Sequence, residues 1–394
     1  MANFGANLQA LSTYRYLQKS GHDPIFIHYM SKQLYERTDG CYNTNDQIKA
    51  HLDFIDSQIL SQTETCFTAD DINKVIDNYK IEGIIVGSDA VLQHHPLLSR
   101  VYLNGSRFNR HIFIEEVNDE RLFPNLFWGS GINPSIKRVY MSVSSQNSEY
   151  KYFTPWLKRD MKKTISGCPY ISVRDLWTQN MLKCITNVEY PITPDPVFAF
   201  NYNCSEIIPT KEYILHKFGL PEKYTLLSFL NLNIPTNIIH NLKTLFKNNP
   251  CVALPSPIGI RFKHDYDYEV SLPLSPIDWY ALIKYSHAYI GNNMHPIVVA
   301  LSNGVPCYSV DNYSNYNFLR HPKNDGSSKI LDLLRKFGLQ NNYIVPFRNN
   351  TINLDKDIFK AIESFPVERV LKKSCNLYYE YEEMMDDILK ALQK

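Results

Sequence analysis

Apolar runs of strand length alternate with helix-length segments along most of the chain. The helical segments carry apolar residues at helical spacing, as in the series Leu8, Leu11, Tyr14 and Leu17. Strands that alternate with helices form parallel sheets covered by helices. The pattern therefore predicts two successive α/β units. Their expected strands lie at 24–29, 84–86, 139–143 and 170–173, and then at 225–229, 252–254, 288–290 and 305–310.

The two predicted units divide at a polar, irregular stretch from Asn201 to Pro209, after which the alternation restarts. We expect an N-terminal Rossmann-like domain over 1–204 and a C-terminal one over 205–366, facing each other across a cleft. This is the α/β architecture of GT-B-like enzymes. A mixed-charge helix over 367–394 is expected to pack back on the first domain.

The chain opens unusually for such a unit. Residues Asn3 to Asn7 look like the turn that follows a strand, but only Met1 and Ala2 precede them. Loop, helix and strand in this order are what a nucleotide-binding unit keeps when its first strand is removed. We expect the first strand of the N-terminal domain to be missing, and the natural protein or its ancestor to begin upstream of Met1.

The stretch from His287 to Asp311 predicts a strand, a turn, a helix and a second strand. Gly291 to Asn293 make the turn, Pro296 begins the helix where its missing N–H costs nothing, and Gly304 ends it. Such a turn aims free backbone N–H groups and the positive end of a helix dipole above the sheet, so an anionic ligand is expected. His295 lies there, where ligands bind in open α/β sheets. An ordinary histidine at a helix start is the alternative.

Two other strand ends carry polar side chains of interest. The triplet Gly87-Ser88-Asp89 would place a hydroxyl and a carboxylate at the sheet edge, to bind sugar hydroxyls or orient a base; a glycine turn with a helix cap is an equal reading. Arg174 follows a strand, and its planar guanidinium can grip a carboxylate or phosphate. A structural salt bridge to Asp175 or Asp195 is an equal reading.

Composition narrows the function by exclusion. The formal net charge is +1 and 21% of residues are charged, which argues against nucleic acid as a partner. The 8 cysteines are scattered without a Cys-x-x-Cys pair, so we expect no zinc site, no disulfide framework and a cytoplasmic location. Adjacent His94 and His95 lack matching carboxylates, so no metal is expected.

The sequence also bears on membranes. No apolar run reaches the length of a membrane-spanning helix, and the first residues lack the basic and apolar regions of a signal peptide. Peripheral contact with a membrane stays open.

Several short segments together resemble the polysaccharide pyruvyl transferase family. Each segment alone is weak evidence for the family. Together they occur in the family's order and spacing, from residue 3 to near Asn312. In chain order the segments are Asn3-Phe-Gly-Ala-Asn-Leu-Gln-Ala, Gly87-Ser-Asp, Tyr140-Met-Ser-Val-Ser, Ile171-Ser-Val-Arg-Asp, Asp195-Pro-Val-Phe, and Met294-His-Pro followed by Gly304-Val-Pro.

This resemblance implies a ketal pyruvyltransferase. Such an enzyme moves the carbon skeleton of phosphoenolpyruvate onto two hydroxyls of one sugar and releases phosphate, without a cofactor. The acceptor would be a lipid-linked or polymeric saccharide of a capsule, exopolysaccharide or cell wall. The N-terminal domain would hold this acceptor and the C-terminal domain the donor.

The resemblance also assigns roles to residues. His295 matches the family's motif histidine and is expected to be the general acid, with a proton shuttle for the sugar hydroxyl as its other role. The expected donor-binding residues are Asn293, Met294, Arg174, Arg261 and Arg320. The expected acceptor-binding residues are Asn3, Gly5, Asn7, Gln9, Ser88, Asp89 and Ser144.

One position departs from the family pattern. Family members commonly have arginine where this chain has Asn293, and asparagine cannot neutralise a phosphate. Loss of a charge-assisted contact of about 1.5–3 kcal/mol weakens donor binding by roughly 10- to 150-fold unless another group replaces it. Arg174, Arg261, Arg320 or the helix N-terminus are the candidates. A sugar-nucleotide-dependent GT-B glycosyltransferase and an inactive glycan-binding homologue are the alternative functions.

Overall fold

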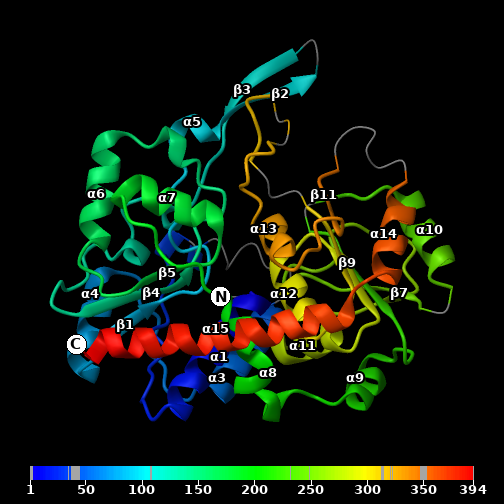
Figure 1. Cartoon of the computed structure of the whole chain (residues 1–394), viewed down its shortest axis with the longest axis horizontal. Helices are drawn as coiled ribbons and strands as arrows, with labels where there is room; N and C mark the ends of the chain where they lie inside the picture. The colour runs from blue at the N-terminus through cyan, green and yellow to red at the C-terminus, as the bar shows by residue number, and fades with distance from the viewer. Residues whose placement is uncertain are drawn as a thin grey trace.

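The structure is a computed structural model that describes residues 3–33, 35–36, 45–106, 109–230, 232–247, 249–311, 315–319, 321, 323–346 and 353–393. Its helices and strands alternate along most of the chain (Figure 1). The helices are α1 (Phe4–Lys19), α3 (Asn45–Gln58), α4 (Ala69–Tyr79), α5 (Leu97–Arg100), α6 (Pro155–Ile165), α7 (Leu176–Thr186), α8 (Phe200–Asn203), α9 (Lys211–Phe218), α10 (Thr236–Leu245), α11 (Pro276–Lys284), α12 (Met294–Ser302), α13 (Lys329–Lys336), α14 (Leu354–Glu363) and α15 (Val367–Gln393). The strands are β1 (Gly83–Val86), β2 (Val101–Ser106), β3 (Asn109–Ile114), β4 (Lys137–Val143), β5 (Ile171–Val173), β6 (Thr225–Ser228), β7 (Cys251–Ala253), β8 (Tyr268–Glu269), β9 (Ala288–Gly291), β10 (Cys307–Val310) and β11 (Tyr343–Ile344).

Two parallel sheets form the centres of the two halves. The first half has a 3-stranded sheet in the order β1-β4-β5, and the second has a 6-stranded sheet in the order β11-β10-β9-β6-β7-β8. Every strand pair within these two sheets is parallel. Helices connect most of the successive strands in these sheets, whereas β7 and β8 are joined by a loop. The structure therefore confirms the two Rossmann-like α/β units that the alternating pattern predicts.

The start of the chain differs from the prediction. In the described part of the chain the first element is α1, and Asn3 is its N-cap, with the side chain accepting a hydrogen bond from the Ala6 N–H at 3.2 Å. Residues Asn3 to Asn7 are thus a cap and a first helical turn, so the predicted loop is wrong. An asparagine that satisfies a free N–H starts a helix as readily as it forms a turn.

The expected strand at 24–29 forms only isolated parallel bridges, from Phe26 to Gln62 and from Tyr29 to Cys66. Its apolar side chains still serve the core, because Ile27 and Tyr29 pack in one cluster with residues of α4 and β1. The hydrophobic pattern therefore correctly indicated a segment that packs in the core, but the segment does not form the predicted continuous strand.

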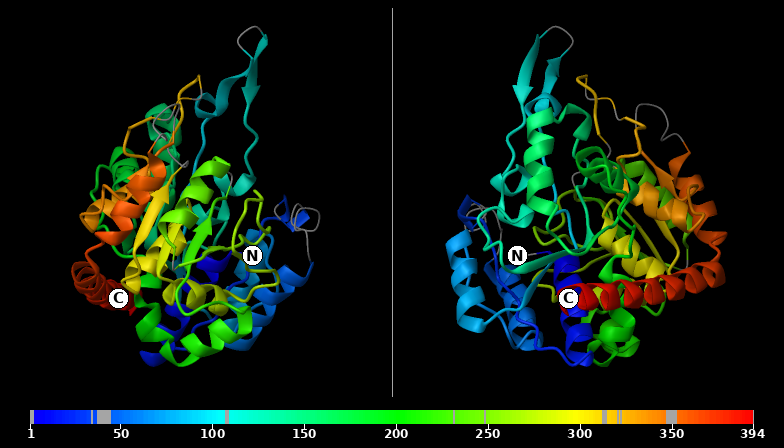
Figure 2. Two further views of the ribbon diagram at one scale, coloured as in Figure 1. Left: turned by 90° about the vertical axis from the view of Figure 1, so that its right-hand side faces the viewer. Right: turned by 60° about the vertical axis from the view of Figure 1, so that its left-hand side comes forward.

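A long β-hairpin, formed by β2 and β3, lies between the first two strands of the first sheet in the sequence. Strands β2 and β3 pair antiparallel, with Val101 opposite Ile114 and Leu103 opposite Ile112. These β-branched and aliphatic cross-strand pairs stabilise a two-stranded ribbon. The polar residues between them hide the strand pattern in the sequence. The hairpin projects from one end of the molecule in every view (Figures 1 and 2).

Helix α15 runs along both halves on one side of the molecule (Figure 1). It contacts β4 in the first half and α12 in the second. The Ser374 hydroxyl donates to the Leu301 carbonyl at 2.8 Å, and the Lys137 ammonium donates to the Leu392 carbonyl at 2.8 Å. The last helix therefore fastens the two halves together.

The core is continuous between the halves because α1 joins it. Phe4 and Leu8 of α1 belong to the same buried cluster as Trp279 of α11 and Ile297 of α12. The rings of Phe4 and Trp279 stack with centroids 5.1 Å apart. The first turn of α1 is thus fixed against the helices of the second sheet. No helix in the described ranges is both long and apolar enough to cross a membrane.

Candidate active site

The amino end of α12 is fixed by its connection to the second sheet. Helix α12 begins at Met294, two residues before the predicted start at Pro296, with Asn293 as its N-cap. The preceding Asn292 is fully buried, accepts a hydrogen bond from the Leu230 N–H at 2.8 Å and donates to the Leu230 carbonyl. These two hydrogen bonds fix the turn against the loop after β6. The positive end of the α12 dipole therefore has a defined position.

His295 lies directly against the backbone of Gly5 at the start of α1. A Cβ atom on Gly5 would be 2.0 Å from Cγ and 2.2 Å from Nδ1 of the His295 ring. Only glycine allows this approach. The Nε2 atom of the ring is buried and has no hydrogen-bond partner among the described residues. The ring is held by packing, and one nitrogen stays available for a ligand.

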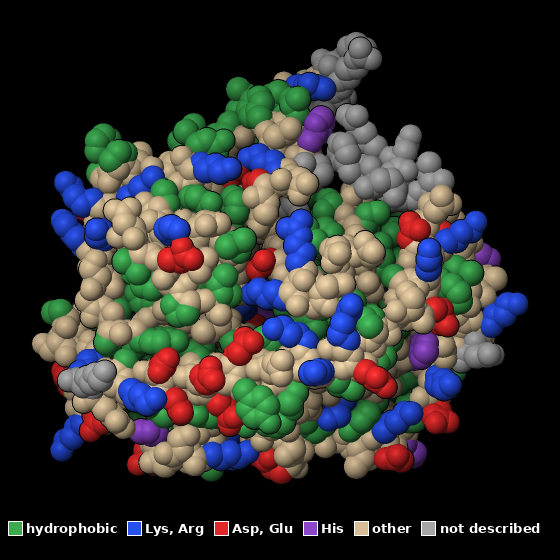
Figure 3. Space-filling view, viewed as in Figure 1, with side chains coloured by type: hydrophobic (Ala, Val, Ile, Leu, Met, Phe, Trp, Pro, Cys, Tyr) green, Lys and Arg blue, Asp and Glu red, His purple; other side chains and the backbone are tan. Residues whose placement is uncertain are grey.

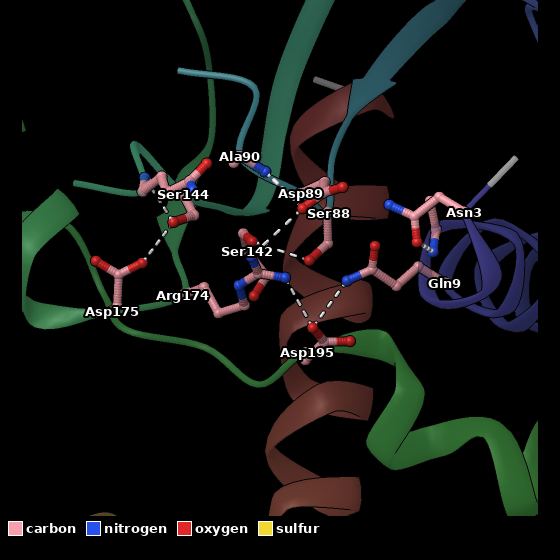
Figure 4. A network of polar contacts seen from close by, with 12 residues as sticks. Asn3, Gln9, Ser88, Asp89, Ala90, Ser142, Ser144, Arg174, Asp175 and Asp195 are labelled. Atoms are coloured by element: carbon pink, nitrogen blue, oxygen red, sulfur yellow. Dashed lines mark hydrogen bonds and ion pairs between the residues drawn. The ribbon is translucent and has the colours of Figure 1, made fainter. Parts of the chain in front are cut away.

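Arg174 joins two carboxylates at the ends of the first sheet (Figure 4). Its Nη1 lies 2.8 Å from Oδ2 of Asp195, and its Nη2 lies 3.6 Å from Oδ1 of Asp89. The side chains of Arg174 and Asp195 are each 2% exposed, and that of Asp89 is 32% exposed. Nε and Nη2 of Arg174 are buried without a hydrogen-bond partner in the described chain. The guanidinium thus keeps two donors for an anion even though it is ion-paired.

Asp195 is oriented by groups from two other elements. Its Oδ2 also accepts a hydrogen bond from Nε2 of Gln9, at 2.8 Å, and its Oδ1 accepts from the Val197 N–H, at 3.0 Å. Gln9 belongs to α1, so the helix that packs on His295 also fixes the partner of Arg174. Both readings of Arg174 therefore apply: it forms a structural ion pair and lies at the candidate site.

The Gly87-Ser88-Asp89 turn is fitted closely onto β4. A Cβ on Gly87 would lie 2.1 Å from the Met141 carbonyl oxygen, and the Ser88 hydroxyl donates to the Ser142 carbonyl at 2.9 Å. Ser142 has a φ of 46° within an irregular stretch of β4. Bulges and left-handed residues of this kind re-aim side chains at functional edges. The Asp89 carboxylate turns toward Arg174 instead of capping a helix.

Lys329, the first residue of α13, is a cation of this cluster that the sequence analysis did not single out. It interacts electrostatically with Arg174, Asp89 and His295, although it makes no ion pair or hydrogen bond within the described part of the chain. Its helix is capped by Ser328, whose hydroxyl also donates to Asp311 at 2.5 Å. The sequence did contain a signal for Lys329. Ser328 is an N-cap residue in the loop that follows a strand, and a helix that starts there has its first residue at the carboxyl edge of the sheet.

The electrostatics of this cluster favour a neutral imidazole. Burial lowers the pKa of His295; Asp195 and Asp89 oppose this shift, while Arg174 and Lys329 add to it, and the net pKa is below the usual 6.5. Burial also lowers the pKa of Lys329, and Arg174 adds to that effect. Burial raises the pKa of Asp89, but the charges of Arg174, His295 and Lys329 outweigh it, so the net pKa is lowered.

The remaining predicted residues have varied positions. Most of the expected acceptor-binding groups are buried and bonded within the protein: Asn7 contacts Nδ1 of His51 at 2.8 Å, and the Ser144 hydroxyl donates to Asp175 at 2.7 Å. The side chains of Gln9 and Ser88 are likewise hydrogen-bonded within the protein. Asn3 is the N-cap of α1 (Figure 4), two residues before Gly5.

The expected donor-binding residues are not all together. Met294 is 7% exposed and packs in the apolar core. Arg261 is exposed and lines a different cavity, near the carboxyl ends of β6 and β7, with its guanidinium over the Phe262 ring. Arg320 lies outside the described residues. Arg174 and Asn293 lie with His295, and Lys329 joins them.

Basic and acidic side chains both face the line where the two halves meet, with Lys and Arg prominent (Figure 3). Within the described ranges, no group of three or more His, Cys, Asp or Glu residues is arranged to hold a metal ion. The arrangement offers a neutral imidazole, two cations and two carboxylates. Such a set can bind a small anion and move a proton.

Two parallel-sheet units joined by a crossing C-terminal helix define a GT-B-type fold, and solved structures confirm this class. The UDP-GlcNAc 2-epimerase of Neisseria meningitidis bound to UDP-GlcNAc has a TM-score of 0.55 and 12% identity, over 98% of this chain and 97% of that one. The UDP-N-acetylglucosamine 2-epimerase of Rickettsia bellii has a TM-score of 0.54 and 9% identity, over 98% and 94%. At these identities the likeness shows the fold alone.

The sequence identifies the family. The model of the polysaccharide pyruvyl transferase family matches residues 3–315, which include α1, Asp89, Arg174 and His295. The chain therefore belongs to the polysaccharide pyruvyl transferase family and is a transferase. No curated protein sequence matches the chain closely enough to count as a relative.

The contact between Gly5 and His295 generates a sharp prediction. In Gly5→Ala, the new Cβ would overlap the imidazole, so we expect the ring to be displaced and turnover to fall by at least roughly tenfold, a cost of about 1.4 kcal/mol in the barrier. The measurement is the rate of product formation, with the melting temperature recorded in parallel.

Gly167→Ala is the matched control, because nothing lies within 4 Å of a Cβ at Gly167. Its rate should equal that of the wild type. Equal rates in Gly5→Ala and Gly167→Ala would show that the position of the imidazole does not matter for turnover.

Proposed function

We propose that the protein transfers the pyruvyl group of phosphoenolpyruvate onto two hydroxyls of one sugar in a capsular, exopolysaccharide or cell-wall glycan, releasing phosphate. The family membership supports a polysaccharide as the acceptor. The observation that supports the donor is the free Nε2 of His295 at the positive end of α12, near Arg174 and Lys329. A small, doubly acidic molecule matches these groups.

The proposed reaction begins with a proton transfer. His295 donates a proton to the methylene carbon of phosphoenolpyruvate, and the adjacent carbon becomes an oxocarbenium-like centre. One sugar hydroxyl attacks this carbon and loses its proton. Phosphate then departs with the electrons of its C–O bond, and the second hydroxyl closes the cyclic ketal and loses its proton. Asp89, the most exposed carboxylate of the cluster, is placed to accept a hydroxyl proton.

Charge balance connects donor binding to this proton. Arg174 and Lys329 bring two positive charges, and Asp89 and Asp195 bring two negative charges, so the empty cluster has no net positive charge while His295 is neutral. A bound dianion would raise the pKa of His295 and draw a proton onto it. The proton that the chemistry needs would therefore be taken up together with the donor.

Lys329 also offers a replacement for the positive charge that the family's arginine would supply at position 293. The family's arginine at that position would supply a permanent cation at the amino end of α12. Here the ammonium of Lys329 reaches the same cluster from α13. Because a half-buried cation without an ion-pair partner among the described residues gains from an anionic ligand, we propose that Lys329 holds the phosphate or carboxylate of the donor.

A sugar-nucleotide glycosyltransferase is the second candidate, because the Neisseria neighbour with this fold is bound to UDP-GlcNAc. The two candidates differ in the ligand that binds the free enzyme. Thermal stabilisation by phosphoenolpyruvate and not by UDP favours the pyruvyltransferase, and the reverse favours the glycosyltransferase.

Release of phosphate tests the proposed function. Incubation with phosphoenolpyruvate and acceptors that carry galactose, mannose or N-acetylmannosamine should release phosphate with at least one acceptor. His295→Ala should lower the rate by about 10²- to 10⁴-fold, the usual contribution of a general acid. His216→Ala, which removes an exposed imidazole from α9, is the control and should keep the wild-type rate. Equal rates in the two variants would contradict the role of His295.

Donor affinity tests the role of Lys329. Lys329→Met keeps the length of the side chain but removes its charge, so the dissociation constant for phosphoenolpyruvate should rise by roughly 10- to 150-fold. Isothermal titration calorimetry measures this change. Arg335→Gln removes an exposed cation from the same helix and should leave the affinity within about twofold. Unchanged affinity in Lys329→Met would place the donor elsewhere.

A further inference from the structure

A second polar cavity lies beside the candidate active site. It has a volume of about 80 Å³ and lies between the base of the β2–β3 hairpin, the loop after β4 and the loop after β10. Val101 and Val117 are its aliphatic lining residues, and the other lining side chains are polar or aromatic. None of them belongs to the cluster around His295. The cavity therefore requires its own explanation.

Two guanidinium groups of this cavity make hydrogen bonds only to neutral groups among the described residues, and Glu115 acts on Arg121 through its charge alone. Arg121 donates from Nε to Oε1 of Gln93 at 3.1 Å and contacts Nε2 of His95 with Nη2 at 3.1 Å. Arg100 donates from Nη1 to the Glu115 carbonyl at 3.3 Å, and its Nε is buried without a hydrogen-bond partner within the described chain. Buried cations without a carboxylate partner are costly, and a bound anion removes that cost.

The other ionisable groups of the cavity do not supply this anion. Glu149 lines the cavity but forms an ion pair with Lys323. Glu115 is exposed. Burial lowers the pKa of His95 to about 3, so its imidazole is neutral near pH 7, and Arg121 adds to that shift. Glu149 is balanced by Lys323, and the charge of Glu115 offsets one of the two guanidinium groups, so the cavity keeps one positive charge in excess.

An unpaired acceptor in the same wall indicates a hydroxyl on the ligand. The Oδ1 atom of Asn147 is buried and has no hydrogen-bond partner in the described part of the chain. An amide oxygen in this state needs a donor such as a sugar hydroxyl. The combination of unpaired guanidinium donors and an unpaired amide acceptor matches a saccharide that carries an acidic group.

The wall of the cavity continues into segments that carry residues of the candidate site. Ser144, which bonds to Asp175 in the candidate site, is three residues before Asn147, so their Cα atoms are at most about 11 Å apart. The segment from Asp89 to His95 also links them, since Asp89 belongs to the candidate site and His95 lines the cavity. Bonds between the segments, such as Leu92 N–H to the Ser144 carbonyl at 3.1 Å, fix this geometry.

We propose that this cavity is an acceptor subsite that binds an acidic group, a carboxylate or a phosphate, on a saccharide unit next to the one that receives the pyruvyl group. The assignment of this saccharide as the acceptor rests on the proposed function. Binding of an acidic saccharide to Arg100 and Arg121 does not depend on it.

The experiment compares three probes by saturation-transfer NMR and calorimetry: glucuronic acid, glucose 1-phosphate and glucose. At least one acidic probe should bind the wild type at least about tenfold more tightly than glucose. Arg100→Gln and Arg121→Gln should each weaken that binding by about tenfold or more. Arg110→Gln, which removes an exposed guanidinium from β3, should leave it unchanged. Melting temperatures show whether each variant is folded, and Arg100→Gln decides the result if Arg121→Gln is unfolded.

The preferred acidic probe distinguishes the two sources of negative charge, since glucuronic acid has only a carboxylate and glucose 1-phosphate only a phosphate. Equal binding of all three probes, or unchanged binding in Arg100→Gln, would overturn the proposal. The proposal would also be overturned if phosphoenolpyruvate, at concentrations near its dissociation constant for the enzyme, displaced the acidic probe. The probe would then occupy the donor site.

The outcome is separable from that of the proposed function. His295→Ala should bind the acidic probe like the wild type, since its ring is not part of the cavity. Retained binding without any phosphate release would contradict the pyruvyltransferase but not the subsite. Phosphate release at equal rates with neutral and acidic acceptors, together with no preference for acidic probes, would contradict only the subsite.

Discussion

The buried guanidinium of Arg174 is the interaction on which the arrangement of the site depends. A charge that is 2% exposed is tolerated only if its partners are held in place, and these partners are Asp195 and Asp89. Each partner is fixed in turn by other elements: Gln9 of α1 bonds to Asp195, and the turn that carries Asp89 is fitted onto β4. Residues far apart in the sequence therefore converge because one cation must be neutralised.

The same helix that serves Arg174 also positions the imidazole. Helix α1 joins the core of the second half through Phe4 and Leu8, and its Gly5 leaves just enough room for the ring of His295. Residues of both halves thus contribute to the candidate site. The domain boundaries expected at residues 204 and 366 stay predictions, but the contacts of α1 and α15 show how closely the halves are connected.

Part of this arrangement could be predicted from the sequence. Alternation of strands and helices gave the fold class, and the position of His295 and Arg174 at strand and helix ends follows from where parallel sheets present their carboxyl edges. Lys329 was missed because its closeness to the cluster is a tertiary contact, made from a helix whose sequence has no motif. Asn7 and Ser144 are hydrogen-bonded within the protein, which a sequence does not reveal, and their contact with an acceptor stays a prediction.

The central claim is that the cluster binds its donor together with a proton on His295. Titration of phosphoenolpyruvate in two buffers with different ionisation enthalpies, near pH 7, measures proton uptake directly. Because burial lowers the pKa of His295 in the empty site and a bound anion raises it, the wild type should take up a proton that His295→Gln does not. Identical proton uptake in the two proteins, or none in either, would contradict this account.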